Sequence, residues 1–112
     1  MSNLKTTGKP RQFATGAQRD SGEGKLRMSL VPHKALNGVM MRYLQGADTY
    51  GENNWKKGMK HSVLYDSTMR HLMQDFTGDD SEDHLGAALW NIMGMIWNRD
   101  HKPEMDDRKE YE

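Results

Sequence analysis

The sequence of 112 residues contains no cysteine, so disulfide bonds, thiolate metal ligands and cysteine nucleophiles are excluded. It has no excess of charge either, because 16 basic residues balance 16 acidic ones, and we expect no extended nucleic acid as partner. The apolar run from Leu85 to Trp97 is broken by Asn91 and is too short to cross a membrane. The N-terminus lacks the apolar segment of a secretory signal. We therefore expect a cytoplasmic protein.

The hydrophobic share of 35% is low for a globular domain, because both ends are polar while the middle is rich in Leu, Met, Trp and Ala. Residues 1–28 show almost no apolar spacing, which predicts a flexible or extended basic arm. Residues 29–99 are expected to form one helical domain, and residues 100–112 a solvated polar tail.

Three stretches have the apolar spacing of amphipathic helices. The first is expected from about Pro32 to residues 48–51, and the second from residue 61 or 62 to Phe76. The third, from Asp83 to about Arg99, is apolar nearly all the way round and should be surrounded by protein. The fold class is therefore all-α, a small bundle of three main helices with an extended arm and a polar tail.

Ser81 is the expected N-cap of the third helix, and the acidic residues around it suit the positive end of the helix dipole. Three helices give a thin core for this length. We therefore expect a homo-oligomer that covers the remaining apolar surface of the third helix.

Polar residues on the otherwise apolar helices are the first candidates for a site. Asp66 and Arg70 are four residues apart, a spacing equally typical of an exposed ion pair. His71 and His84 are as typical of satisfied core groups as of ligands. Asn91 lies seven residues after His84 on the same helix face, and a buried amide needs partners. It favours a site or a polar network between helices.

The acidic loop before the third helix is a weak signal for a metal, because such loops are usually only solvated. Its carboxylates, Asp79, Asp80, Glu82 and Asp83 beside His84, suit Mg²⁺ or Mn²⁺. Metalloprotease, EF-hand, P-loop and nucleophile-elbow motifs are absent from the sequence.

Basic residues gather in two groups: Arg19, Lys25 and Arg27 in the arm, and Lys56, Lys57 and Lys60 around Trp55. Basic segments flanked by glycine can bind phosphates, and a neighbouring aromatic side chain can stack on a base. From spacing alone, however, a mobile arm and a surface loop are favoured.

Several motifs occur in the order found in a family common in phage genomes. They are Thr15-Gly16-Ala17-Gln18-Arg19-Asp20 with Glu23-Gly24-Lys25, Tyr50-Gly51 with Asn54-Trp55-Lys56-Lys57-Gly58, Asp66-Ser67 with Arg70-His71-Leu72, and Glu82-Asp83-His84-Leu85 with Ala88-Leu89-Trp90-Asn91. Over about residues 14–97 the chain resembles the N-terminal domain of dATP/dGTP diphosphohydrolases. The resemblance implies hydrolysis of a purine dNTP to the monophosphate and pyrophosphate, with Mg²⁺ or Mn²⁺, in an infected bacterial host.

The third helix is also distantly similar to that of the all-α nucleotide pyrophosphohydrolases. Those enzymes place paired carboxylates, Glu-x-x-Glu and Glu-x-x-Asp, on two helices, and the aligned acidic position here is Ala87. Glu104 and Asp107 have the right spacing, but they fall in the polar tail. The His-Asp dipeptide with which HD-type phosphohydrolases bind metal is also absent from the sequence.

The resemblance implies a metal-bound water that attacks phosphorus, with a carboxylate or histidine as base. The expected catalytic residues are Asp66, His71, His84 and Asn91, the metal ligands Asp66, Asp83 and His84, and the substrate-binding residues Arg19, Lys25, Arg27, Trp55, Lys56 and Arg70. Two alternatives remain open. The missing paired carboxylates favour a non-catalytic protein that binds or sequesters a nucleotide, whereas ten methionines are typical of a small phage protein that binds a host protein.

Overall fold

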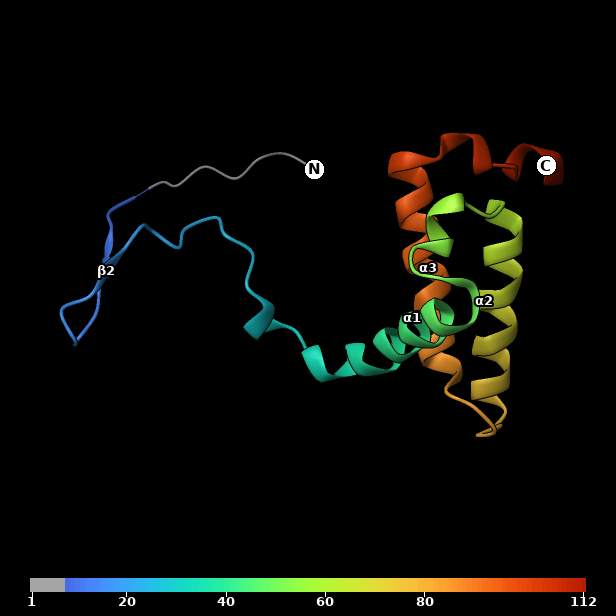
Figure 1. The fold of residues 1–112 in the computed structure, drawn as a ribbon, viewed down its shortest axis with the longest axis horizontal. Helices are drawn as coiled ribbons and strands as arrows, with labels where there is room; N and C mark the ends of the chain where they lie inside the picture. Colours follow the sequence, from blue (N-terminus) through green and yellow to red (C-terminus); the bar gives the residue numbers. More distant parts are fainter. Residues whose placement is uncertain (1–7) are drawn as a thin grey trace. The chain divides into compact units, whose positions relative to one another are not determined.

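The computed structural model describes residues 8–112, and the first seven residues of the predicted arm lie outside the described residues. The chain divides into two compact units at the boundary between His33 and Lys34, so each unit is described by itself. The sequence places the start of the helical part at residue 29. Figure 1 shows the helices of the second unit and the hairpin of the first.

A short antiparallel hairpin forms part of the N-terminal unit. Strand β1 (Arg11–Gln12) pairs with strand β2 (Gln18–Arg19), with Arg11 opposite Arg19. Gly16 turns the chain between them at a φ of 91°, which favours glycine. One 3₁₀ turn, η1 (Met28–Leu30), follows. The sequence does not predict this hairpin, because strands of two residues show no alternating pattern.

Three helices form the core of the helical unit, which confirms the predicted all-α class. They are α1 (Asn37–Tyr50), α2 (His61–Phe76) and α3 (His84–His101). Figure 1 shows α2 and α3 running antiparallel side by side, and α1 crosses them in contact with α3. Four short 3₁₀ helices complete the chain: η2 (His33–Leu36), η3 (Asn54–Lys57), η4 (Pro103–Met105) and η5 (Arg108–Tyr111).

Small residues allow α1 and α3 to cross closely. Ala87 and Ala88 of α3 are buried, as is Val39 of α1. A Cβ atom added to Gly38 would collide with the carboxylate of Asp83, and one added to Gly86 would lie 3.1 Å from the carbonyl carbon of Gly38. Both glycines therefore leave the room that the close crossing and the Asp83 side chain occupy.

The N-cap of α3 is Asp83, so the prediction of Ser81 as N-cap is wrong. The side chain of Asp83 accepts a hydrogen bond from the amide of Gly86 at 3.0 Å. The helix begins at His84, and a capping side chain must stand directly before the first helical residue. The amide of Ser81 donates instead to Asp79 at 2.9 Å.

The C-terminal segment differs from a wholly solvated tail, because Asp107 is buried against the start of α2. Its carboxylate accepts hydrogen bonds from the amide of Ser62 at 2.9 Å and from the Ser62 hydroxyl at 2.5 Å. It thereby caps an unpaired amide in the first turn of α2. A cap supplied from 45 residues away gives no local sequence signal.

A single chain does not enclose α3 on every side. Four of its large apolar side chains are between 37% and 53% exposed: Leu85, Ile92, Met93 and Ile96. The prediction that protein surrounds this helix therefore depends on the predicted homo-oligomer. Among the described residues, no helix combines the length and apolarity needed to cross a membrane.

Candidate functional site

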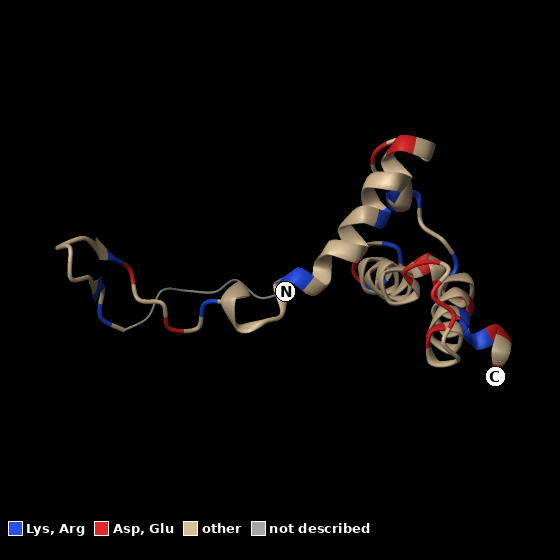
Figure 2. Cartoon of the chain, turned by 90° about the horizontal axis from the view of Figure 1, so that it is seen from below, with Lys and Arg blue, Asp and Glu red and all other residues tan. Residues whose placement is uncertain are grey.

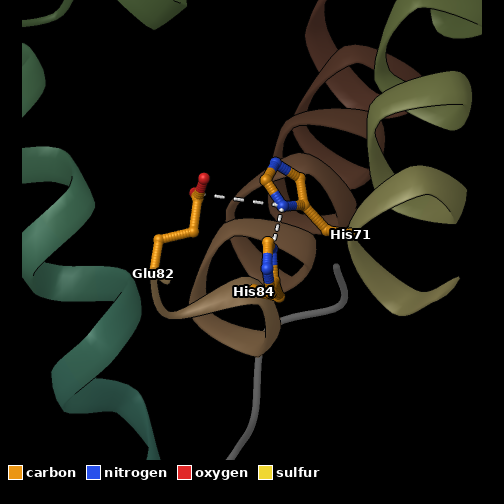
Figure 3. A group of neighbouring side chains, drawn as sticks. All are labelled: His71, Glu82 and His84. Atoms are coloured by element: carbon orange, nitrogen blue, oxygen red, sulfur yellow. Dashed lines mark hydrogen bonds and ion pairs between the residues drawn. The ribbon is translucent and has the colours of Figure 1, made fainter. Parts of the chain in front are cut away.

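His71, Glu82 and His84 bring three potential metal-ligand atoms within 4.8 Å of one another. Figure 3 shows His71 on α2, His84 at the start of α3 and Glu82 on the loop between them. Because α2 and α3 are antiparallel and joined by a short loop, a residue late in α2 lies beside the first residue of α3. The chain connectivity itself therefore assembles the cluster.

The two histidine rings are in direct contact. Nδ1 of His71 lies 2.9 Å from Nδ1 of His84, so one nitrogen carries the proton and the other accepts it. The His84 side chain is 1% exposed, and its Nε2 lies 3.1 Å from a carboxylate oxygen of Asp79. That carboxylate favours the proton on Nε2, which leaves Nδ1 of His84 with its lone pair facing His71.

Burial lowers the pKa of His71 below the ordinary imidazole value. The negative charge of Glu82 opposes this shift, while the nearby His84, Arg42 and Arg70 add to it. His71 is therefore neutral at neutral pH and has a lone pair available. A metal-binding imidazole must be in this form.

Glu82 lies between an imidazole and a guanidinium. Its Oε1 accepts a hydrogen bond from Nη2 of Arg42 at 2.6 Å and lies 4.0 Å from Nδ1 of His71. The hydrogen bond from Arg42 lowers the pKa of Glu82. Hydrogen bonds from Ser81, and then from His84, likewise lower the pKa of Asp79. Both carboxylates are therefore ionised at neutral pH.

The donor set of the cluster fits a divalent transition-metal ion better than Mg²⁺. Two imidazole nitrogens with one carboxylate suit transition-metal ions such as Fe²⁺ or Zn²⁺, whereas Mg²⁺ takes oxygen ligands almost exclusively. Asp79 adds the carboxylate partner on the far nitrogen of His84 that commonly orients a metal-binding histidine.

The structure brings together His71 and His84, two of the predicted catalytic residues, but with Glu82 as their carboxylate. Asp83, predicted as a metal ligand, caps α3 instead of joining the cluster. Asp66, predicted as both ligand and catalytic residue, also lies outside the cluster. It is exposed and lines a hollow with residues of the C-terminal segment.

Asn91 belongs to a polar network between α2 and α3. Its Nδ2 donates to the hydroxyl of Ser67 at 3.1 Å and to the carbonyl of Ala87 at 2.9 Å. Because Ser67 precedes His71 by one helical turn, this contact lies next to the histidine pair along the same interface. Arg70 is exposed and donates to Ser67 at 3.4 Å. Among the described residues it forms no ion pair with Asp66.

Trp55 lies in an aromatic cluster beside a pocket of the helical unit. Its ring centroid is 5.9 Å from that of Tyr43 and 5.2 Å from that of Trp97. The ammonium group of Lys56 lies 5.6 Å from the Trp55 ring centroid. Tyr43, Trp55 and Trp90 line the pocket together with the loop at residues 50–54. An aromatic lining of this kind suits a planar base.

The predicted phosphate-binding residues of the arm belong to the N-terminal unit, and two positions compared with the pyrophosphohydrolases have structural roles. Arg19, Lys25 and Arg27 belong to the N-terminal unit and are exposed. Ala87, which stands at the position of a carboxylate in the pyrophosphohydrolases, is buried in the core. Asp107 is occupied as the cap of α2.

The sequence predicts neither the contact of Arg42 with Glu82 nor the contact of Asp79 with His84. Arg42 lies 40 residues from its partner Glu82, and nothing in its local pattern distinguishes it from a solvated helix residue. The sequence identifies Asp79 only as one of several loop carboxylates. The signal for its role is its position five residues before a histidine at a helix start.

Fold and cluster define a small helical protein with a candidate metal centre between antiparallel helices. The profile of the family described as dATP/dGTP diphosphohydrolase, N-terminal, matches residues 15–108, and the chain belongs to this family. The predicted resemblance is thereby confirmed.

Over 100 residues the chain is 29% identical to a dATP/dGTP diphosphohydrolase of Salmonella phage PMBT28. The match covers 85% of this chain and 33% of that protein, so the chain spans a third of the relative's length. No solved structure matches the chain.

Proposed function

We propose that this protein takes part in the metal-assisted hydrolysis of a purine dNTP to the monophosphate and pyrophosphate. The proposal depends on one observation: the residues that match the family, 15–108, include the cluster of His71, Glu82 and His84. The phage relative supplies the activity and the substrate by its description. We further propose that the reaction takes place in the cytoplasm of an infected bacterium.

A divalent ion held by the cluster would neutralise phosphate charge and activate water. Asp79 fixes the ring of His84 by accepting a hydrogen bond from the Nε2–H of that ring, which leaves Nδ1 of His84 with a lone pair. The contact between the two rings then places the proton of His71 on Nδ1, and a metal ion bound at that atom would require this proton to move to Nε2. Asp66 and Asn91 remain candidates for positioning the water or the substrate. Phosphate contacts are proposed for Arg70, Lys56 and the arm residues Arg19, Lys25 and Arg27. The base would lie in the pocket lined by Trp55.

Incubation of the full chain with each dNTP tests this proposal, with Mn²⁺ or Mg²⁺ present and products separated by chromatography. We expect dATP or dGTP to yield monophosphate and pyrophosphate, faster with Mn²⁺ than with Mg²⁺. His84→Ala should abolish turnover, whereas His33→Ala, which removes an exposed histidine, should not. Asp66→Asn decides whether that carboxylate contributes. Intact dNTPs with every metal would contradict hydrolysis by this chain.

A second candidate function is nucleotide binding without hydrolysis by this chain. It is favoured by the match to only a third of the relative and by Ala87 at the position of a carboxylate. Calorimetric titration with dATP and Mn²⁺, followed by recovery of the nucleotide, distinguishes the two functions. Saturable binding with all nucleotide recovered intact supports this second candidate.

A further inference from the structure

Arg42 reaches the candidate metal centre from a third helix. It lies on α1, and its Nη2 donates both to Oε1 of Glu82 at 2.6 Å and to the backbone carbonyl of Asp83 at 3.2 Å. Gly38, one helical turn earlier on the same helix face, allows α1 to approach the start of α3. The close crossing therefore holds a guanidinium beside the centre, and Figure 3 shows α1 passing on the Glu82 side of the cluster.

The carboxylate of Glu82 has two competing partners. As a metal ligand it would share its negative charge with a divalent cation, and that cation would repel the guanidinium only a few ångströms away. A divalent ion bound to Glu82 would therefore weaken the hydrogen bond from Arg42 to this carboxylate. The guanidinium of Arg42 would then be free to bind another anion, and the planar arrangement of its N–H donors matches the oxygens of a phosphate.

An open hollow beside this pair supplies the space. It is lined by Gly38, Arg42, Gln45, Glu82 and Asp83, together with two further residues of α1. Among its described lining residues Arg42 is the one cation, against two carboxylates. Without a metal the hollow thus disfavours an anion, whereas a divalent ion on Glu82 reverses the balance of charge.

We propose that Arg42 is a phosphate-binding residue of this site, and that its guanidinium transfers from Glu82 to a metal-bound phosphate of the nucleotide. The inference rests on the proposed function and deepens it, because it orders the binding steps. Metal binds first and phosphate second, and Arg42 opposes the first step while it supports the second. A purely structural ion pair between α1 and the loop would not show these opposite effects.

Two calorimetric titrations of the full chain test this proposal: Mn²⁺ alone, and inorganic pyrophosphate in the presence of saturating Mn²⁺. For Arg42→Gln we expect Mn²⁺ to bind several-fold more tightly and pyrophosphate to bind about tenfold more weakly. Arg42→Lys should keep part of the pyrophosphate affinity. Arg99→Gln, which removes an exposed arginine paired with Asp100, is the matched control and should change neither value. Circular dichroism establishes that each variant is folded.

Changes of the same sign in both titrations, no change in either, or equal changes in Arg99→Gln would overturn the role of Arg42. Neither titration depends on turnover. If the wild type binds Mn²⁺ and pyrophosphate but leaves every dNTP intact, hydrolysis fails as the function, while Arg42 is still judged by the two affinities. If the wild type binds no Mn²⁺, the metal centre and the role of Arg42 both fail.

Discussion

Glu82 supplies the carboxylate of the candidate centre and is the residue through which α1 contacts it. Glu82→Gln keeps the shape of the side chain but replaces an anionic ligand by a neutral amide. We expect at least a tenfold loss of Mn²⁺ affinity, measured by calorimetry, because a carboxylate ligand contributes charge as well as geometry. The side chain is 45% exposed, so the fold should persist.

The control for Glu82→Gln is Asp80→Asn in the same loop. It removes one negative charge from a residue outside the cluster, and it should leave the Mn²⁺ affinity nearly unchanged. Equal losses in the two variants would mean that the loop attracts Mn²⁺ only by its overall charge. The cluster would then not be a metal site.

At the residue level, the sequence could reveal the histidines but not their carboxylate. His71 and His84 are polar residues on apolar helices, and such exceptions are visible without a structure. Glu82 is one of four acidic residues in five positions, so composition alone cannot select it. The choice depends on how the loop turns and on Arg42, which lies 40 residues away. From the sequence alone, Asp66 and Asp83 are equally reasonable carboxylate ligands, and only the path of the loop distinguishes Glu82 from them.

At the level of elements, two glycines of α1 provide a test of the helix crossing. An alanine at Gly38 would place its Cβ against the Asp83 carboxylate, whereas a Cβ at Gly46 meets nothing within 4 Å. We expect Gly38→Ala to destabilise the fold by about 1–3 kcal/mol despite its better helix propensity. Gly46→Ala should stabilise it by about 0.5–1 kcal/mol. Urea denaturation measures both, and stabilisation by Gly38→Ala would contradict the crossing.

The contact between the C-terminal segment and α2 should depend on pH. Hydrogen bonds from Ser62 lower the pKa of Asp107 in the folded state. A carboxyl group with a lowered pKa stabilises the fold above its unfolded pKa of about 3.9, and this contribution disappears as the pH falls through the folded value. Asp107→Asn should therefore be less stable than the wild type at pH 7, and the difference should shrink below about pH 4.

Urea denaturation at pH 7 and pH 3, followed by circular dichroism, measures this difference. Glu104→Gln removes an exposed carboxylate of the same segment and should behave like the wild type at both values. If Asp107→Asn is as stable as the wild type at pH 7, the cap does not stabilise α2.

Local periodicity explains which elements could be predicted. The bounds of α2 follow directly from the apolar spacing of residues 61–76. The predicted bounds of α3 differ from the observed ones by one residue at the start and two at the end. The hairpin of the arm is too short for a periodic signal. The cap from Asp107 and the close crossing at Gly38 both depend on pairs distant in sequence, and local patterns do not contain such pairs.

At the scale of the whole molecule, the exposed apolar residues of α3 predict self-association. Ile92, Met93 and Ile96 are between 37% and 45% exposed, and covering them would extend a thin core. We expect sedimentation equilibrium to give a mass above the 12.9 kDa of one chain, and Ile96→Lys to shift it towards that value. The exposed Lys109→Glu, a charge change in the C-terminal segment, is the control. A monomeric wild type at micromolar concentration would contradict the prediction.

The two units carry opposite net charges although the whole chain is neutral. Residues 8–33 contain five Lys and Arg against two Asp and Glu, whereas residues 34–112 contain ten against fourteen. Within each unit, Figure 2 shows the two signs interspersed along the chain. A triphosphate is thus favoured by the arm and disfavoured by the helical unit unless a metal is bound.

This difference in net charge predicts that removing positive charges from the arm and from the helical unit will change the nucleotide affinity to different extents. The triple variant Arg19→Gln, Lys25→Gln and Arg27→Gln should bind dATP with Mn²⁺ about tenfold more weakly and with a smaller dependence on salt, because fewer cations contact phosphate. Its affinity for Mn²⁺ alone should not change. The matched variant Lys34→Gln, Arg99→Gln and Lys109→Gln removes the same charge from the helical unit and should retain nucleotide affinity, since these three exposed residues belong to neither the proposed metal site nor the proposed base pocket. Equal weakening in both variants would show that net charge, and not contact with the arm, attracts the nucleotide.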